Sequence, residues 1–264
     1  MSSKVDVVIV TKTVDEVLPE TINGLKTYPF QKTIVIASKD STKPDWCDIL
    51  KIDKGKLGKA RNTGIDFANS DYVCMVDADI VLTPGYVNDL LKYFQNSKVV
   101  AVGGKLKSSI RSLYALTKEQ VFRGYCKVHS DLPCGGTVYR AETVKKERFN
   151  DNLSGGEDHE LHTRLKKKKY RVIYAEKTSC FHYFKGDMKK EIFLCMFSGA
   201  RTGLFSSLVR AAISPFRSLI YVLTCRDSVY SLFIPPFYVT QWIAHVIGAF
   251  FKEEEVRAKM RALG

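Results

Sequence analysis

Short β-branched runs alternate with segments of helical periodicity in the first part of the chain, and this alternation is the strongest constraint on the fold. The strand-like runs lie at residues 5–10, 33–37, 49–52, 71–76 and 99–102. Between them, apolar residues recur at three- and four-residue spacing over residues 14–25, 60–68 and 83–94, as they do in amphipathic helices. Strands joined by helices form βαβ units, which require a largely parallel sheet. The sequence therefore predicts an α/β fold.

The composition is that of a globular protein. The chain has 264 residues, of which 45% are hydrophobic and 26% are charged, enough for one α/β domain with an appendage or for two modest domains. Its seven cysteines are scattered and form no CxxC pair, which argues against a zinc site and a disulfide framework. The strand-like run begins directly after Met1–Lys4, leaving no room for a secretory signal, so we expect the chain to stay inside the cell.

The pattern of residues 105–155 is harder to interpret. Residues 157–168 then predict a helix, and residues 170–175 and 179–183 predict strands. After Gly186 the chain becomes apolar with few acids as far as Phe251. We therefore divide the chain into a first domain over residues 1–186 and a helical region over residues 187–264, which ends in a charged, solvated helix at 252–261.

The C-terminal region has features of a membrane-associated segment. Arg210 and Arg217 share one face of a predicted helix over residues 204–225, as is typical of an interfacial helix. Residues 229–251 hold no formally charged side chain and are long enough to cross a bilayer. Their prolines and polar residues make a bent interfacial or re-entrant element an equal alternative, and a helical subdomain packed on the core is the third.

Two aspartates one residue apart, Asp77 and Asp79, follow the strand at 71–76. Both carboxylates are expected at the carboxyl edge of the sheet, where open α/β sheets bind ligands. There they could hold a divalent cation through oxygen ligands, and the cation could neutralise a diphosphate. On spacing alone, however, a solvated turn or a helix cap is the more common outcome for such a pair.

Three further motifs surround this acid pair in a fixed order. They are Gly58-Lys59-Ala60-Arg61-Asn62-Thr63-Gly64, then Glu157-Asp158-His159-Glu160-Leu161-His162-Thr163-Arg164-Leu165, and finally His182. Over about residues 5–185 this arrangement resembles the family 2 glycosyltransferases of the GT-A fold. The resemblance implies a GT-A (Rossmann-like), mixed and mostly parallel sheet flanked by helices. It also implies an inverting transfer from a nucleoside-diphosphate sugar by single displacement, with no covalent sugar–enzyme intermediate.

The resemblance also implies a metal site. Asp79 would be the direct ligand, Asp77 would lie beside it, and His182 would complete the set. A mixed carboxylate and imidazole set is compatible with Mn²⁺ or Mg²⁺. The cation would carry the charge that develops on the departing diphosphate. Without the order of motifs that is typical of the family, the simpler interpretation of His182 is a core histidine between two aromatic residues.

The general base implied by the resemblance is Asp158. It begins a predicted helix, whose positive end favours an ionised carboxylate, and Glu157 would orient the acceptor or the base. Both acids are otherwise common first-turn residues.

The remaining expected contacts are to the donor and the acceptor. Lys59 and Arg61 are expected to face the diphosphate, although Arg61 can instead be structural and pair with an acid of the sheet edge. Thr11, at the end of the first strand, matches a position beside the nucleoside. Gly135 and Gly136 allow the acceptor to approach closely, or form a plain turn.

One departure from the family pattern concerns the nucleotide. Similar enzymes usually carry an acidic pair after the second strand, whereas this chain has Ser38 and Lys39 there, with Asp40 displaced. UDP is therefore the default nucleotide and GDP is possible.

The charge balance bears on the partners. Lys and Arg outnumber Asp and Glu by 41 to 28, and the net charge of +13 favours a polyanionic partner. Beside an apolar C-terminal region, the basic run Lys166–Lys169 favours an anionic membrane surface. A basic nucleic-acid-binding protein is the rival, but no interleaved basic and aromatic motif supports it, so we expect no nucleic acid. A nucleotidyltransferase would show glycines after the first strand, which residues 10–14 lack.

We therefore expect a membrane-associated enzyme at the cytoplasmic face of the cell membrane. Its acceptor is expected to be a lipid-linked glycan. The alternative acceptor is a polyprenyl phosphate, which is ionised near neutral pH and needs no base.

Overall fold

The computed structural model describes residues 3–183, 188–225, 227–252, 254–256 and 258, and at residues 190, 197, 199, 201 and 202 it describes the backbone alone. The chain divides into two compact units. The first consists of Met1–Ser109 and His129–Tyr183, and the second of Ile110–Val128 and Phe184–Gly264. The second unit thus takes in residues 110–128, which the sequence did not separate from the first domain. The predicted boundary between residues 186 and 187 lies outside the described residues.

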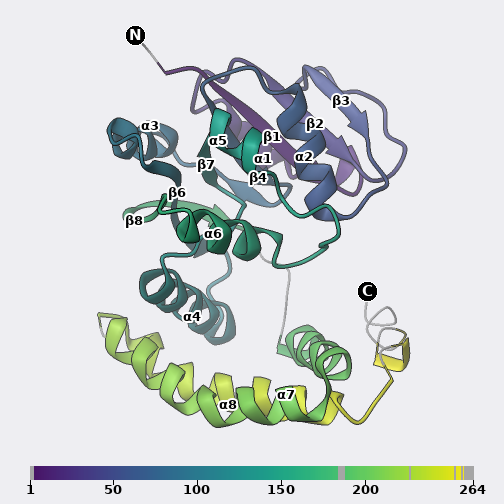
Figure 1. Ribbon diagram of the computed structural model, residues 1–264, viewed down its shortest axis with the longest axis vertical. Coiled ribbons are helices and arrows are strands. Elements are labelled where there is room, and N and C mark those ends of the chain that lie inside the picture. Colours follow the sequence, from purple (N-terminus) through teal and green to yellow (C-terminus); the bar gives the residue numbers. More distant parts are fainter. Residues whose placement is uncertain (1–2, 184–187, 226, 253, 257, 259–264) are drawn as a thin grey trace. The chain divides into compact units, whose positions relative to one another are not determined.

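An eight-stranded mixed sheet forms the centre of the first unit (Figure 1). In spatial order its strands are β3 (Ile49–Ile52), β2 (Thr33–Ala37), β1 (Val5–Thr11), β4 (Tyr72–Asp77), β7 (Thr137–Arg140), β6 (Val99–Ser108), β8 (Arg171–His182) and β5 (Ile80–Val81). The pairs β2–β3, β1–β2, β1–β4 and β6–β8 are parallel, whereas β7 and β5 run antiparallel to their neighbours. The predicted mixed, mostly parallel sheet flanked by helices is confirmed.

Helices cover both faces of this sheet because side chains alternate between the faces along each strand. Val7 and Ile9 of β1 belong to a buried core that includes residues of α1 (Pro19–Leu25), α3 (Tyr86–Leu91) and the 3₁₀ helix η2 (Lys92–Gln95). Val8 belongs to a second core, with residues of α2 (Leu57–Phe67), α5 (Ala141–Glu147) and α6 (Glu157–Lys167). The second core therefore holds the helices that carry the Gly58–Gly64 and Glu157–Leu165 motifs.

Several predicted elements differ from the structure. The helix predicted over residues 14–25 splits into a 3₁₀ helix, η1 (Val14–Glu16), and α1, because Pro19 lacks an N–H and begins a new helix. The strand predicted to end at Val102 continues through two glycines to Ser108. The two strands predicted at 170–175 and 179–183 form a single strand, β8, over Arg171–His182. Residues 105–155, which showed no clear periodicity, contain β7, α5 and a further helix, α4 (Leu113–His129).

The second unit is helical in its described residues. Besides α4 it holds α7 (Met188–Thr224), η3 (Val229–Phe233) and α8 (Ile234–Gly248), and Figure 1 shows α7 and α8 side by side. The φ of 78° at Gly203 interrupts α7. Gly124 of α4 lies against Tyr221 of α7, since a Cβ on this glycine would be 2.9 Å from the tyrosine Cβ.

Of the forms of membrane association that the sequence predicts, the structure bears on a bilayer-spanning helix. In the part of the chain that the structure describes, no helix is both long enough and apolar enough to cross a bilayer. The membrane-associating role of residues 187–264 stays a prediction. The charged helix predicted at 252–261 falls partly outside the described residues.

Candidate active site

The carboxyl ends of the central strands bring the first predicted residues to one edge of the sheet. In the pairing of β1 with β4, Val10 lies opposite Asp77, so Thr11 and Asp77 end adjacent strands. Thr11 is buried, and its hydroxyl donates to the Thr13 carbonyl at 2.8 Å. Asp79 follows after one residue, just before β5. Thr11 and the acid pair therefore lie at the same edge of the sheet, and the contact of Thr11 with a nucleoside stays a prediction.

Arg61 connects two of the predicted motifs. It lies on α2 with 4% of its side chain exposed, and its Nε donates to Glu157 Oε1 at 3.0 Å. Its Nη2 donates to Asp77 Oδ1 at 3.1 Å. A single guanidinium thus joins the acid pair after β4 to the first residue of α6. The alternative in which Arg61 pairs with an acid of the sheet edge is what the structure contains.

The electrostatics of this cluster keep the arginine charged. Burial alone would lower the pKa of Arg61, but the carboxylates of Asp77 and Glu157 raise it above its ordinary value. Burial raises the pKa of the Glu157 carboxyl, and Arg61 opposes that shift. Arg61 Nη1 is buried and has no hydrogen-bond partner in the described part of the chain. One donor of the cluster is therefore not used by the protein.

Asp158 lies in the first turn of α6, directly after Glu157. Its Oδ2 accepts a hydrogen bond from the Cys134 backbone N–H at 3.1 Å, and its Oδ1 accepts one from the His159 N–H at 2.7 Å. The side chain is partly exposed. The carboxylate is thus held against the loop that precedes β7, within the same cluster as Arg61.

The two glycines of that loop have different roles. A Cβ on Gly135 would be 2.6 Å from Asp77 Oδ2, so the loop approaches the carboxylate closely only because a side chain is missing there. Gly136 has a φ of 84°, and its carbonyl accepts a hydrogen bond from the Tyr86 hydroxyl at 2.7 Å. Gly135 therefore borders the candidate site, whereas Gly136 forms the turn.

Asp79 and His182 are brought together by the pairing of β5 with β8, in which Ile80 lies opposite His182. The distance from His182 Nε2 to Asp79 Oδ2 is 3.2 Å. Asp77, the third predicted ligand, pairs with Arg61 instead. Among the described residues, no three acidic, histidine or cysteine side chains converge on a point that could hold a metal ion. Of the described side chains, two predicted ligands thus lie together here.

Two protein ligands suit a cation whose coordination sphere is completed by oxygen atoms of the substrate. Mg²⁺ is commonly bound by one or two protein groups together with substrate phosphates and water. The side chains of Asp79 and His182 are 42% and 32% exposed, which leaves room for such a substrate.

Lys59, which was expected to face the diphosphate, is exposed in the first turns of α2 and has no ion pair among the described residues.

The sequence interpretation missed two sets of residues that hold the site. Asn62 is 2% exposed and exchanges hydrogen bonds with the backbone of Phe149, while its Nδ2 also donates to Asp151 Oδ1. A Cβ on Gly58 would be 2.0 Å from the Asn150 carbonyl oxygen. The motif on α2 therefore anchors the loop that leads towards α6. In the sequence, only the position of Asn62 directly after Arg61 indicated that this asparagine belongs to the site.

The second missed set is a buried network behind Asp158. Asp131 is 1% exposed and contacts Nδ1 of both His159 and His162, the latter at 2.7 Å. His162 Nε2 is 2.9 Å from the Tyr139 hydroxyl. This network ties the loop before β7 to α6. The three-residue spacing of the histidines places them on one helix face, but nothing in the sequence pointed to Asp131.

A buried thiol, that of Cys134, lies beside this cluster. Burial raises the pKa of Cys134 well above its ordinary value, and Arg61 lowers it only in part. The thiolate is the nucleophilic form of a cysteine, and burial disfavours it here. The expectation that the reaction needs no separate nucleophile stays a prediction.

Comparison with known proteins follows the same motifs. The model for Glycosyl transferase family 2 matches residues 6–186. The minor teichoic acid biosynthesis protein GgaB from Bacillus subtilis (strain 168) is 25% identical over 146 residues. That match covers 50% of this chain but only 16% of GgaB, so the chain spans a small part of its relative.

Solved structures share the fold. The mannosyltransferase PcManGT from Pyrobaculum calidifontis, in complex with GDP-Man and Mn²⁺, superposes with a TM-score of 0.57 at 15% identity, over 100% of this chain and 81% of that one. S. aureus TarS 1-349 in complex with UDP gives a TM-score of 0.51 at 13% identity, over 89% of this chain and 91% of that one. At these identities the likeness supports the fold alone.

The family match contains every motif that builds the candidate site, from Arg61 through Asp77 and Asp79 to Asp158 and His182. It covers more than half of the chain, and it coincides largely with the unit that holds the eight-stranded sheet. The chain therefore belongs to glycosyl transferase family 2, and the predicted enzyme class, a glycosyltransferase, is confirmed.

Proposed function

We propose that this enzyme transfers a sugar, with inversion, from a nucleoside-diphosphate sugar to a hydroxyl group of a lipid-linked glycan. The observation that carries this proposal is the Arg61 bridge, which holds Glu157 and Asp77 on one guanidinium and so brings the helix of the proposed base to the proposed diphosphate site. Related folds have been solved with GDP-Man, UDP and UDP-GlcNAc, which supports a nucleotide-sugar donor. UDP remains our default nucleotide, with GDP as the alternative.

A divalent cation, Mn²⁺ or Mg²⁺, would be held by Asp79 and His182. When bound, it supplies positive charge that stabilises the departing diphosphate. Asp77, held by Arg61, would face the ribose or the coordination sphere of the cation. Lys59 and the free donor Nη1 of Arg61 supply further positive groups for the diphosphate or for the loop around it.

Asp158 would accept the proton of the attacking hydroxyl. The carboxylate is fixed by two backbone N–H groups, and its partial exposure leaves it accessible to an acceptor. Gly135 would allow the acceptor to come close to Asp77. Because a phosphate acceptor is already ionised near neutral pH, a positioned base favours a hydroxyl acceptor over a polyprenyl phosphate.

The test is a panel of nucleotide sugars assayed with Mn²⁺ or Mg²⁺ and a membrane lipid extract. We expect sugar transfer by the wild type and a loss of at least a hundredfold in Asp158→Asn. Asp45→Asn, which removes an exposed carboxylate from the same unit, serves as the matched control. Undiminished transfer by Asp158→Asn would remove this residue as the base.

We further propose that the second unit docks on the cytoplasmic face of the cell membrane. The described part of α7 exposes several large apolar side chains, among them Phe205 at 81% and Phe216 at 70% exposure. Val209, Ile213, Phe216 and Ile220 follow a three- and four-residue spacing and share one helix face. Arg210 and Arg217 border that face, so an anionic lipid surface would meet both apolar and basic groups.

Vesicle sedimentation tests this docking. Replacing Phe205 and Phe216 with serine should reduce binding of the full chain to vesicles that contain an anionic phospholipid. Tyr93→Ser, at an exposed aromatic position of the first unit, should leave binding unchanged. Equal binding by all three proteins would refute docking through α7.

A further inference from the structure

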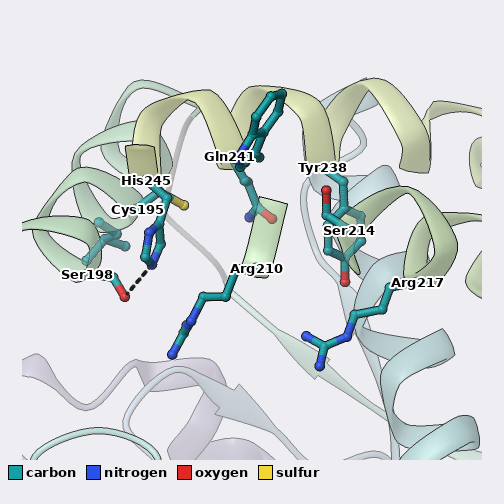
Figure 2. Close-up of a pocket in the computed structure, with 10 residues that line it drawn as sticks. Cys195, Ser198, Arg210, Ser214, Arg217, Tyr238, Gln241 and His245 are labelled. Atoms are coloured by element: carbon teal, nitrogen blue, oxygen red, sulfur yellow. Dashed lines mark hydrogen bonds between the residues drawn. The ribbon is translucent and has the colours of Figure 1, made fainter. Parts of the chain in front are cut away.

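A pocket lies within the second unit, between α7 and α8 (Figure 2). Its volume is about 300 Å³. The residues that matter below are Arg210 and Arg217 of α7 and Tyr238, Gln241, Trp242 and His245 of α8. Nothing in the proposed sugar transfer uses this pocket, because the candidate active site belongs entirely to the first unit.

The pocket offers positive charge that no carboxylate of the described residues pairs with. Figure 2 shows the Arg210 and Arg217 side chains extending in the same direction from α7. In the described part of the second unit, the ion pairs join Lys118 to Glu191 and Arg123 to Asp227, and neither pocket arginine takes part in one. Arginine is permanently charged and suits the oxygens of a phosphate group.

One donor beside the arginines is unused. Trp242 Nε1 is buried and has no hydrogen-bond partner among the residues described. Glu191 accepts hydrogen bonds from Lys118 at 2.6 Å, Tyr114 at 3.1 Å and Gln241 at 2.6 Å. That carboxylate is therefore already satisfied by cationic and neutral donors. The two guanidinium groups and the indole N–H suit a ligand with several acceptor oxygens.

The positive charge of the pocket comes from its two arginines. Burial and the neighbouring Glu191 raise the pKa of the Cys195 thiol to about 12, which favours the neutral thiol. Burial, helped by Arg210, lowers the pKa of His245, which favours the neutral imidazole. Both ring nitrogens of His245 are within hydrogen-bond distance of serine hydroxyls, Ser207 at 2.9 Å and Ser198 at 3.1 Å.

The surroundings of the pocket indicate a ligand with an apolar tail. The exposed stripe of Val209, Ile213, Phe216 and Ile220 runs along α7 next to the two arginines, and Ile243 and Ile247 of α8 are also exposed. A soluble phosphate compound would gain nothing from these side chains, whereas a lipid would bury them. The charge and the apolar stripe thus select the same class of ligand.

We propose that this pocket binds the phosphate group of a lipid, and so holds the carrier of the lipid-linked acceptor. This inference rests on the proposed membrane docking and on the proposed acceptor class. Arg210, Arg217 and the Trp242 N–H would contact the phosphate oxygens, while the tail lies on the exposed apolar stripe.

The experiment measures binding of the full chain to three kinds of phosphatidylcholine vesicle. One contains a polyprenyl phosphate, one contains phosphatidylglycerol at equal surface charge, and one contains phosphatidylcholine alone. The variants are Arg210→Gln with Arg217→Gln, and separately Trp242→Phe. Lys189→Gln with Lys252→Gln removes the same charge from exposed positions of the same unit and is the matched control.

We expect the double arginine variant to lose about tenfold or more in affinity for polyprenyl phosphate vesicles, with a smaller loss on phosphatidylglycerol. Trp242→Phe should lower binding to the polyprenyl phosphate alone, and its thermal unfolding shows whether it is folded. The lysine control should lose equally on both anionic vesicles. If the arginine and lysine variants lost the same affinity for every kind of vesicle, binding would depend on general surface charge, and the proposed lipid-phosphate site in the pocket would be refuted.

Two further measurements separate this inference from its alternatives. Inorganic phosphate that competes with the vesicles at micromolar concentration would show a site for free phosphate and would overturn the lipid ligand. Stabilisation of the protein by UDP or GDP with Mn²⁺ reports the first unit and should be unchanged in the arginine variant. If nucleotide stabilisation is absent while the vesicle results hold, the donor proposal fails and the pocket stands.

Discussion

Replacing Arg61 with methionine should destabilise the protein more than any surface ion-pair substitution. The side chains of Arg61 and Glu157 are 4% and 3% exposed and their charged atoms lie 3.0 Å apart, whereas Asp77 is 39% exposed and can be solvated. With an effective dielectric constant of about 20, two charges at this distance attract each other by roughly 5 kcal/mol. Removing one partner of a buried pair costs about 3–5 kcal/mol, because the other charge is left unpaired.

The stability lost in Arg61→Met should depend on pH, because the remaining carboxyl of Glu157 can take up a proton. Burial already raises the pKa of Glu157 in the folded protein, and the loss of Arg61 removes the main influence that lowers it. A carboxyl with a raised pKa in the folded state favours folding below its unfolded pKa, and this contribution is lost as the pH rises through the folded pKa. Arg61→Met should therefore lose less stability at pH 5 than at pH 8.

Urea unfolding at both pH values measures this effect. The matched control is Arg148→Met, which breaks an exposed ion pair. The side chains of Arg148 and Asp66 are 39% and 55% exposed, so this substitution should lower the free energy of unfolding by less than about 1 kcal/mol. Adding Glu157→Gln to Arg61→Met should recover part of the loss at pH 8. A loss below about 1 kcal/mol for Arg61→Met, or no recovery in the double variant, would show that the pair is not the buried electrostatic link we describe.

Two other predictions follow from the site. Asn62→Ala should lower the free energy of unfolding by about 2–3 kcal/mol in urea titrations, because it leaves buried backbone groups of Phe149 without partners, whereas the exposed Asn152→Ala should have little effect. His182→Gln should reduce the rise in thermal unfolding temperature that Mn²⁺ with UDP or GDP gives the wild type, since it removes one of two expected ligands. An unchanged rise would exclude His182 from the metal site.

The parallel core of the fold was predictable because its signals are local. β2 and β3 have the bounds expected from sequence, and β4 and α6 differ from the expected ranges by about a residue. These elements are buried strands or helices with strong periodicity. The helix α4 was not predicted as such, because tertiary packing determines it. Gly124 of α4, for example, lies against Tyr221, far along the chain.

The chemistry of the site was predictable residue by residue, but its connections were not. The order of motifs that this chain shares with the family identified Asp77, Asp79, Asp158 and His182 as candidates. The structure places Asp79 beside His182. It does not show how these residues act, so their catalytic and metal-binding roles stay predictions. A pairing of Arg61 with an acid of the sheet edge was one of the alternatives, but no sequence spacing could reveal that the same guanidinium also binds Glu157 of α6.

The position of Asp158 illustrates why such connections matter for activity. Its carboxylate is held by the backbone of Cys134, in a loop that is also fixed by Asp131 through two histidines of α6. Gly135 of the same loop borders Asp77. The loop therefore fixes the distance between the proposed base and the acid pair, and a change at buried Asp131 would alter catalysis without touching any substrate. That coupling arises from residues between the motifs, where family resemblance offers no guide.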